Sequence, residues 1–493
     1  MPEKPRVERL TPLDLLMPRT YIQALLTFRT RSSTSAVSQS LQYGLDKLLT
    51  QIPWLSGRVV PTTSTTGTQE KATPALEIHW GFKEEPTTFA LIDKGSISAS
   101  YDTLSASGMP PADIPADVWP MPDTSDAALF AQGAPVFAAS LFNFADGRGI
   151  GLCICAHHSA VDVTGFAQIV RLWARNTAGS GSGSPFSWKN RDRLDRLSQA
   201  ISPDLGVTEL LSTENIFASH PEYSNMPPTL PETGLPQCTS SVFSISLARV
   251  YALRDQILKP HDEAKPATSQ SLSTNTLVCA LLWSAVTRAR ARRNQSLLDN
   301  LSRLVMAVDG RRRITEPSFS RPGDPYLGNT VLYSLAKLPV KQLTGASFNL
   351  APGLLHREDK SPGIICDAIA VSQSPSRIST RYIAEVFSLV NRVEDYRSVF
   401  PGWDLFGSRD LTITSWADLD FYDMDFGAGI GKAEYMRLPY MEADGVCLIL
   451  PRKRDRAMDG TERADQVVEV MVLLRRDDME ALDWDDTWKS FLY

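Results

Sequence analysis

The stretch HHSAVD, residues 157–162, decides how this chain is interpreted. It places two imidazoles and one carboxylate close together in a chain of 493 residues that has only 6 histidines. The apolar run 150–156 precedes it and predicts a strand that is covered on both faces. The segment 163–176 follows it with the apolar spacing of an amphipathic helix. The motif therefore lies at a strand-to-helix junction, where α/β proteins commonly place catalytic and binding residues.

Composition narrows the class of protein. Apolar residues make up 43% of the chain, charged residues make up 22%, and the formal net charge is −6. This balance argues against a broad nucleic-acid surface. No apolar run approaches the roughly 20 residues of a membrane span, and the N-terminus has no secretory signal. The 6 cysteines are scattered, as expected of reduced thiols. We therefore expect a cytoplasmic protein with neither a membrane partner nor a nucleic-acid partner.

The pattern of strands and helices predicts an α/β fold with mixed sheets. Length alone favours two large domains. We divide the chain into an N-terminal domain at 1–205, a polar and proline-rich crossover linker at 206–240, and a C-terminal domain at 241–493. Thr274 or Asn275 is expected to cap the helix 276–290. The further elements expected in the second half are strands at 242–247, 304–308, 330–336, 445–451 and 467–474 and a helix at 248–258.

The chemistry of the motif is that of proton transfer. A histidine near its ordinary pKa can take a proton from a hydroxyl or an amine at neutral pH. A His-x-x-x-Asp pattern is common by chance, however, so a purely structural histidine is the alternative. A shared metal ion is disfavoured, because adjacent histidines at a strand end point to opposite sides. We therefore expect no metal. The sequence Asp425-Phe426-Gly427 does not indicate a kinase, since no glycine-rich loop or His-Arg-Asp loop precedes it.

Five further motifs accompany HHSAVD in a fixed order. They are LTPLD at 10–14, DGR at 309–311, LGN at 327–329, TSW at 414–416 and DFGAG at 425–429. Together they resemble the acyl-CoA-dependent acyltransferases of the BAHD family, over nearly the whole chain. The extended stretch GAGIGKAE, residues 427–434, is closer to the fungal branch, which includes trichothecene acetyltransferase-like enzymes. Ala428 and Ala433 depart from the tryptophan and proline that are usual in plant members.

The resemblance implies a fold and a reaction. The fold would be two chloramphenicol-acetyltransferase-like domains with a channel between them, in a monomer. The reaction would move an acyl group, by default acetyl, from acyl-CoA to a hydroxyl, or less readily an amine, of a small secondary metabolite. It would proceed through a ternary complex, with acyl-CoA as co-substrate and with no bound cofactor.

The resemblance also assigns roles to residues. His157 would be the general base midway along the channel, and Thr414 and Trp416 would stabilise the oxyanion. Asp162 would pair with Arg311 to hold the catalytic loop. The remaining assignments are a structural turn at Asp425 and Gly427, remote from the chemistry, and phosphate partners for CoA at Ser271, Ser273, Arg288 and Arg290. For these two arginines, a solvated helix end is an equally good interpretation.

Two other functions fit the same motifs. A condensation-type domain shares the histidine motif and the fold, but it takes its acyl group from a carrier-protein thioester. The late Asp-Phe-Gly motif and the lack of a carrier segment favour free CoA. A catalytically silent protein could bind metabolites in the same channel, although His157, Thr414 and Trp416 together argue against this.

Overall fold

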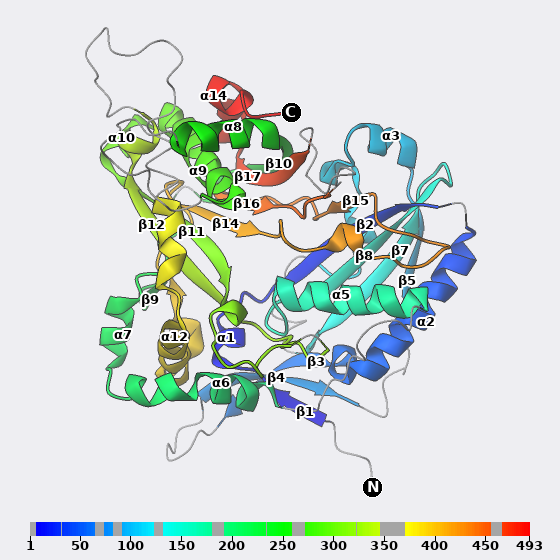
Figure 1. Ribbon diagram of the computed structural model, residues 1–493, viewed down its shortest axis with the longest axis horizontal. Coiled ribbons are helices and arrows are strands. Elements are labelled where there is room, and N and C mark those ends of the chain that lie inside the picture. The colour runs from blue at the N-terminus through cyan, green and yellow to red at the C-terminus, as the bar shows by residue number, and fades with distance from the viewer. Residues whose placement is uncertain are drawn as a thin grey trace.

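The structure is a computed structural model with two halves that lie side by side (Figure 1). The first half is built around the sheet that contains β2 and β8, and the second around the sheet that contains β11 and β14. The described residues are 6–30, 32–64, 73–81, 91–122, 132–179, 192–232, 234–258, 272–321, 323–345, 370–454 and 466–493.

The first large sheet carries the histidine motif. Its strands run in the order β15-β2-β8-β7-β5. Every residue of β8 is buried, which confirms the prediction of a strand covered on both faces. Leu152 and Ile154 face the core beneath α2 and α5, whereas Cys153 and Cys155 face the core beneath α3. The bounds are β2 Tyr21–Arg29, β5 Ile92–Ser96, β7 Phe137–Asn143, β8 Gly149–His157, β15 Tyr435–Arg437, α2 Thr34–Gln51, α3 Tyr101–Ala106 and α5 Val163–Ala178.

The second large sheet is mixed, as predicted. Its strands run in the order β10-β17-β16-β14-β11-β12, and β14 is parallel to both β11 and β16. Helix α9 is buried along most of its length against this sheet. The bounds are β10 Cys238–Ser246, β11 Leu301–Asp309, β12 Val331–Pro339, β14 Leu411–Ser415, β16 Val446–Ile449, β17 Val467–Arg475, α8 Leu247–Leu258, α9 Thr274–Arg293, α10 Val340–Leu343, α13 Arg476–Asp483 and α14 Asp486–Lys489.

The start of α9 differs from the prediction. Ser273 is the N-cap, and its hydroxyl accepts a hydrogen bond from the backbone N–H of Thr276 at 3.1 Å. Thr274 and Asn275, the predicted caps, lie inside the first turn. All three residue types are good caps, so the sequence could not separate them.

Smaller layers complete the molecule. A short sheet runs in the order β1-β4-β3-β6, and β9 pairs with β13. Helices α6, α7 and α12 pack together through apolar side chains such as Ile201, Ile216 and Leu389. The bounds are β1 Arg6–Arg9, β3 Arg58–Ser64, β4 Thr73–Trp80, β6 Ala134–Pro135, β9 Tyr223–Ser224, β13 Phe400–Pro401, α1 Pro12–Leu15, α6 Arg193–Thr208, α7 Thr213–Ser219 and α12 Thr380–Arg392.

The two halves exchange elements across the predicted linker. Strand β15 belongs to the C-terminal half of the sequence, but it pairs with β2 of the first sheet. Helix α6 belongs to the N-terminal half, but it packs on α12. The division at 206–240 therefore follows the order of the chain more closely than its packing, and the predicted linker itself contains α7 and β9.

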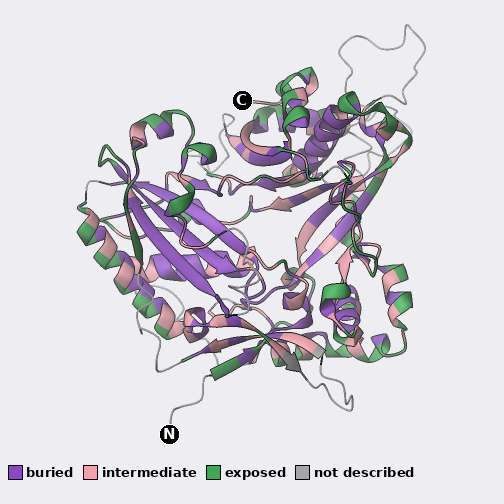
Figure 2. Ribbon diagram, turned by 180° about the vertical axis from the view of Figure 1, so that it is seen from behind, coloured by how far each residue is buried: buried purple, intermediate pink, exposed green. Residues whose placement is uncertain are grey.

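Burial separates the sheet from its helical cover (Figure 2). The strands β2 and β8 are buried almost throughout, whereas the outward side of α2 is exposed. In the described part of the chain, no helix is long and apolar enough to cross a membrane.

Candidate active site

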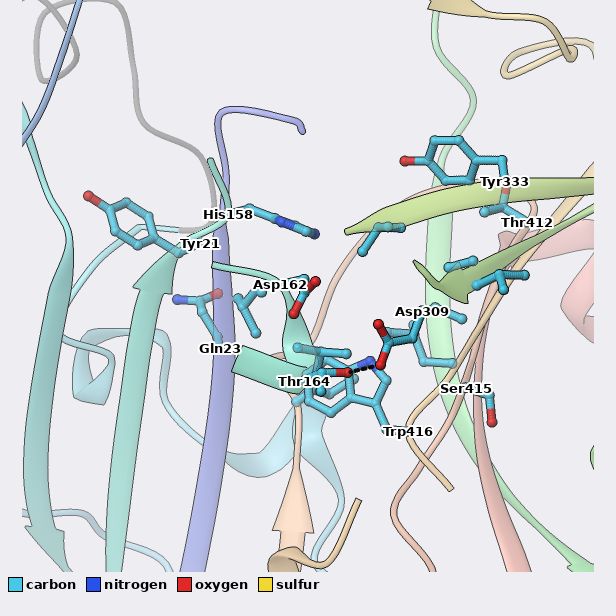
Figure 3. Close-up of a pocket in the computed structure, with 18 of the residues that line it drawn as sticks. Tyr21, Gln23, His158, Asp162, Thr164, Asp309, Tyr333, Thr412, Ser415 and Trp416 are labelled. Carbon is cyan, nitrogen blue, oxygen red and sulfur yellow. Dashed lines mark hydrogen bonds between the residues drawn. The ribbon is translucent and has the colours of Figure 1, made fainter. Parts of the chain in front are cut away.

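A cavity of about 300 Å³ lies where the two halves meet (Figure 3). The first half contributes residues of β2 and of the loop after β8, and the second half contributes residues of β11, β12 and β14. The cavity therefore occupies the position of the predicted channel. It is lined by Tyr21, Ile22, Gln23, His158, Asp162, Val163, Thr164, Ala307, Val308, Asp309, Val331, Tyr333, Thr412, Thr414, Ser415, Trp416, Leu438, Pro439, Met441 and Leu448.

The two adjacent histidines occupy different environments. His158 is half-buried and lines the cavity, and its Nδ1 is buried, which leaves Nε2 as the nitrogen that a substrate can reach. His157 is the last residue of β8, is fully buried and is not among the lining residues. The predicted position of His157 in the channel is therefore wrong, because successive side chains alternate between the faces of a strand.

The contacts of His157 are structural. Its Nδ1 accepts a hydrogen bond from the backbone N–H of Ser159 at 3.2 Å, and its ring packs edge-on against Tyr21 at 5.3 Å. Its own backbone N–H donates to the carbonyl of Val136 at 2.8 Å. These contacts fix the turn that carries His158 into the cavity.

Both histidines are neutral near pH 7. Burial lowers the pKa of His157 to about 3, and the neighbouring His158 and Arg19 add to the shift. Burial also lowers the pKa of His158, although the Asp162 carboxylate opposes the shift. A neutral imidazole is the form that can accept a proton, so His158 is ready to act as a base at physiological pH.

Asp162 and Arg311 form the ion pair that the sequence predicted. The guanidinium holds both carboxylate oxygens, with Nη1 to Oδ2 at 2.8 Å and Nη2 to Oδ1 at 3.0 Å. Asp162 also caps α5, because Oδ1 accepts from the backbone N–H of Gly165 at 2.9 Å. Its Oδ2 accepts from the backbone N–H of Thr330 at 3.0 Å. The carboxylate therefore ties the histidine loop to two segments of the other half.

A second set of contacts holds the backbone of His158. Asn329 donates from its side-chain amide to the carbonyl of His158 at 2.9 Å and to Asp14 at 2.8 Å. The backbone N–H of His158 donates to the carbonyl of Thr20 at 2.9 Å. The LTPLD and LGN motifs thus meet at the histidine and position it.

Gly165 allows this junction to close. A Cβ at Gly165 would lie 2.2 Å from the carbonyl oxygen of Leu327. The first turn of α5 therefore packs directly on the LGN loop, and a larger residue at position 165 would push them apart.

The proposed oxyanion residues lie in the same cavity. Thr414 and Trp416 both line it, at the end of β14. Trp416 is fixed by a stacked contact with Phe421 at 6.3 Å and by a backbone hydrogen bond to Ile449 at 2.8 Å. The structure therefore brings Thr414 and Trp416 to the cavity that also contains His158.

The Asp-Phe-Gly motif lies away from the cavity. Asp425 is exposed and accepts a hydrogen bond from the backbone N–H of Gly427 at 2.8 Å. Gly427 has a φ of 96°, and a Cβ there would lie 2.9 Å from the Cα of Ala178 at the end of α5. Phe426 is buried against Phe28 and Trp173. Neither Asp425 nor Gly427 lines the cavity, so both have the geometry of a structural turn.

The predicted phosphate partners are not brought together. Ser271 lies outside the described residues, and Ser273 lines a second cavity of about 260 Å³. Arg288 pairs with Asp485 at 2.7 Å, and Arg290 is buried against Asp444 at 2.8 Å.

Arg288 and Arg290 therefore have carboxylate partners within the fold, and their assignment to CoA stays a prediction. Their charges are neutralised within the fold, and the solvated helix end that was the alternative does not describe the buried Arg290. They also lie near the opposite end of α9 from Ser273, roughly 25 Å along the helix for Arg290.

Comparison with known proteins identifies the family. Residues 121–487 match the Transferase family, and residues 20–176 match the trichothecene 3-O-acetyltransferase-like N-terminal domain. Because the first of these matches spans more than half of the chain, this chain belongs to the Transferase family of BAHD-type acyltransferases.

Relatives and solved structures cover almost the whole chain. Trichothecene 8-O-acetyltransferase of Fusarium sporotrichioides is 26% identical over 99% of this chain and 98% of its own length. Fumigaclavine B O-acetyltransferase of Aspergillus fumigatus is 25% identical over 96% of this chain and 95% of its own. F. sporotrichioides TRI101, complexed with coenzyme A and T-2, matches with a TM-score of 0.73 at 19% identity and 99% coverage of both chains. Vinorine synthase matches with a TM-score of 0.58 at 16% identity, over 100% of this chain and 95% of its own.

The sequence alone did not single out three residues of this site. The spacing could have identified His158, because a His-x-x-x-Asp pattern that ends at Asp162 begins four residues earlier, at His158. His157 stands five residues before Asp162 and does not fit the pattern. Asn329 carried a signal in the LGN motif, but nothing in the sequence showed that its amide reaches His158. Asp309 belongs to the DGR motif, but its place on the cavity wall depends on how β11 meets α5.

Proposed function

We propose that this chain transfers an acetyl group from acetyl-CoA to a hydroxyl of a small secondary metabolite, with His158 as the general base. The observation that carries the proposal is a neutral, half-buried His158 at a cavity shared by both halves, with Asp162 and Arg311 fixing its loop. The named relatives that are O-acetyltransferases support the same reaction.

The first step is proton removal during attack on the thioester. The Nε2 of His158 accepts the proton of the acceptor hydroxyl as its oxygen forms a bond to the thioester carbonyl carbon. Both substrates are held in one cavity, so the reaction is a direct transfer within a ternary complex. His157 has no part in this step, because it is fully buried and is not among the residues that line the cavity.

The second step is collapse of the tetrahedral intermediate. The oxyanion is stabilised by hydrogen bonds from the hydroxyl of Thr414 and the indole N–H of Trp416, two donors among the residues that line the cavity. The carbon–sulfur bond then breaks, and the protonated His158 returns its proton to the departing thiolate of CoA. The imidazole is neutral again at the end of each turnover.

The second cavity is the proposed route for CoA. Ser415 lines the first cavity, and its hydroxyl donates at 2.7 Å to Asn275, which lines the second together with Ser273 and Arg452. The chain passes from one cavity to the other within the segment 412–418. We assign the thioester to the first cavity and the rest of CoA to the second.

A thiol-release assay tests the proposed reaction. Purified protein is incubated with acetyl-CoA and a panel of hydroxylated fungal polyketides, terpenoids and alkaloids, and free CoA is measured. CoA release that depends on an acceptor and is lost in His158→Ala is the expected result. A folded protein that releases no CoA with any acceptor, but accepts an acyl group from a carrier-protein thioester, would instead be a condensation-type enzyme. A protein that binds acceptors without any transfer would be a silent binding protein.

We further propose that the chain acts as a monomer in the cytoplasm. Light scattering coupled to size exclusion tests the first point, with a mass near 54.4 kDa expected. Imaging of the tagged protein in a producing cell tests the second.

A further inference from the structure

The cavity wall holds two carboxylates whose hydrogen bonding differs. Both oxygens of Asp162 are fully used, because Oδ1 accepts from Gly165 and Arg311 and Oδ2 accepts from Arg311 and Thr330. Its oxygens therefore have no capacity left for a substrate. Asp162 lines the cavity only as part of the frame.

Asp309 is bonded on one side only. Its Oδ1 accepts from the backbone N–H and the guanidinium of Arg311 and from the hydroxyl of Thr330, each at 3.0 Å. Within the described ranges, Oδ2 has a single donor, the hydroxyl of Thr164, at a long 3.4 Å. Thr164 is itself a lining residue, so Oδ2 lies at the cavity wall, where Figure 3 draws the contact. This oxygen has unused acceptor capacity.

Asp309 is ionised, so a hydrogen bond that its Oδ2 accepts is a strong one. Burial raises the pKa of Asp309, but the charge and hydrogen bonds of Arg311 outweigh burial and hold it below its ordinary value. The side chain is 30% exposed, so a ligand can reach it. Two carboxylates share one guanidinium here, which leaves this part of the wall with a net negative charge.

The surroundings are mostly apolar. Val308, Val331, Leu438 and Met441 are among the side chains that form the wall. A wall of this kind favours an apolar ligand, and a charged hydrogen-bond acceptor within it selects strongly for a ligand that satisfies that acceptor.

We propose that Oδ2 of Asp309 is a specificity determinant that binds a hydrogen-bond donor on the acceptor other than the hydroxyl being acylated. The acceptor class is therefore an apolar polycyclic alcohol that carries a second hydroxyl or a protonated amine. This inference rests on the proposed function, since it assigns the alcohol to the same cavity. Asp309 acts by binding and takes no part in proton transfer.

Binding to rigid probes tests the inference without any need for turnover. The probes are 1-adamantanol, 1,3-adamantanediol and 3-amino-1-adamantanol, which share one apolar cage and differ in the second group. Titration calorimetry at neutral pH is expected to give affinities for the diol and the amine that exceed that of 1-adamantanol by about tenfold, with the cationic amine the tightest. Equal affinity for all three, or no measurable binding of the diol and the amine, would overturn the inference.

Two variants locate the effect. Asp309→Asn keeps an oxygen in the place of Oδ1 for Arg311 and Thr330 but puts an N–H₂ group in the place of Oδ2. The preference for the diol and the amine is expected to fall to within about twofold of 1-adamantanol. In the matched control, Thr164→Val, the competing hydroxyl is removed and the preference is kept or increased. A preference that survives in Asp309→Asn, or that is lost equally in Thr164→Val, contradicts the role of Oδ2.

The binding experiment and the transfer assay can contradict the two proposals independently. A protein that binds the diol and the amine preferentially but releases no CoA from acetyl-CoA would retain the role of Asp309 and lose the proposed reaction. A protein that releases CoA but binds all three probes equally would retain the reaction and lose the role of Asp309. Only the second outcome counts against this inference.

Discussion

Two sequence motifs lie at the two ends of helix α5 and have different roles: HHSAVD at its start and DFGAG at its end. At its start, Asp162 caps the helix and His158 lines the cavity. At its end, Gly427 packs on Ala178, some 24 Å away for a helix of 16 residues. The first end is tied to the other half by a buried ion pair, whereas the second presents an exposed Asp425.

The difference shows that a sequence motif alone does not say whether its residues serve the reaction or the packing of the fold. At the start of α5, the motif constrains the position of one side chain, the neutral imidazole of His158, which a substrate must reach. At the end of α5, the constraint is a close approach of two backbones, which only a glycine with a positive φ permits. A change to the His158 imidazole should therefore act mainly on the rate, and a change to Gly427 should act mainly on stability.

The largest effect is expected at the first end, from the adjacent histidines. His158→Ala should lower kcat by about 100-fold to 10,000-fold, because it removes the general base, while the melting temperature changes little. His157→Asn should keep kcat within about tenfold of the original, since an amide oxygen can replace Nδ1 as the acceptor for Ser159.

Steady-state kinetics and thermal melting of both variants check this pair. If His157→Asn melts normally but loses as much kcat as His158→Ala, His157 would be the general base. The comparison of the two histidines would then be wrong.

The next effect is expected from the ion pair that holds the loop. Asp162→Asn keeps an oxygen that can cap α5 but loses the charge opposite Arg311. Breaking a buried pair of this kind costs about 3 kcal/mol or more, so the free energy of unfolding should fall together with kcat. Denaturant titration and kinetics on the same preparation measure both. Lost activity with unchanged stability would mean that Asp162 takes part in the chemistry directly.

The sequence predicted these elements well where one signal dominated. The apolar run before HHSAVD and the period of the following segment gave β8 and α5 nearly to their observed ends. It failed where the answer depended on which face a side chain takes, as with His157 and His158. The sequence also could not show that Arg288 pairs with Asp485, because only the folded chain brings the two residues together.

A smaller effect is expected from pH. It depends on His158 at the start of α5 and on nothing at the other end of the helix. Burial holds the pKa of His158 below its ordinary 6.5, and the neutral form is the base. The rate should therefore be nearly constant above pH 6.5 and should fall only in more acidic solution, as the imidazole gains a proton. Single-turnover rates across this range measure the profile. A rate that keeps rising well above pH 6.5 would mean that the base has an ordinary or raised pKa.

The smallest effect on rate is expected at the second end. Gly427→Ala should lower the free energy of unfolding by about 1–3 kcal/mol, because a Cβ would strain a φ of 96° and press on Ala178. The rate of the folded fraction at low temperature should stay near that of the original, because no cavity-lining residue contacts the turn through this position.

Gly431→Ala is the matched control for that substitution. Gly431 also has a positive φ, 79°, but a Cβ there would meet nothing within 4 Å. It therefore carries the backbone strain alone, and the excess destabilisation of Gly427→Ala measures the contact with the end of α5. If both variants melt alike, the contact contributes nothing and strain explains the glycine. If Gly427→Ala instead lowers kcat in a protein that melts normally, the two ends of α5 are coupled, and the separation of chemistry from packing along this helix does not hold.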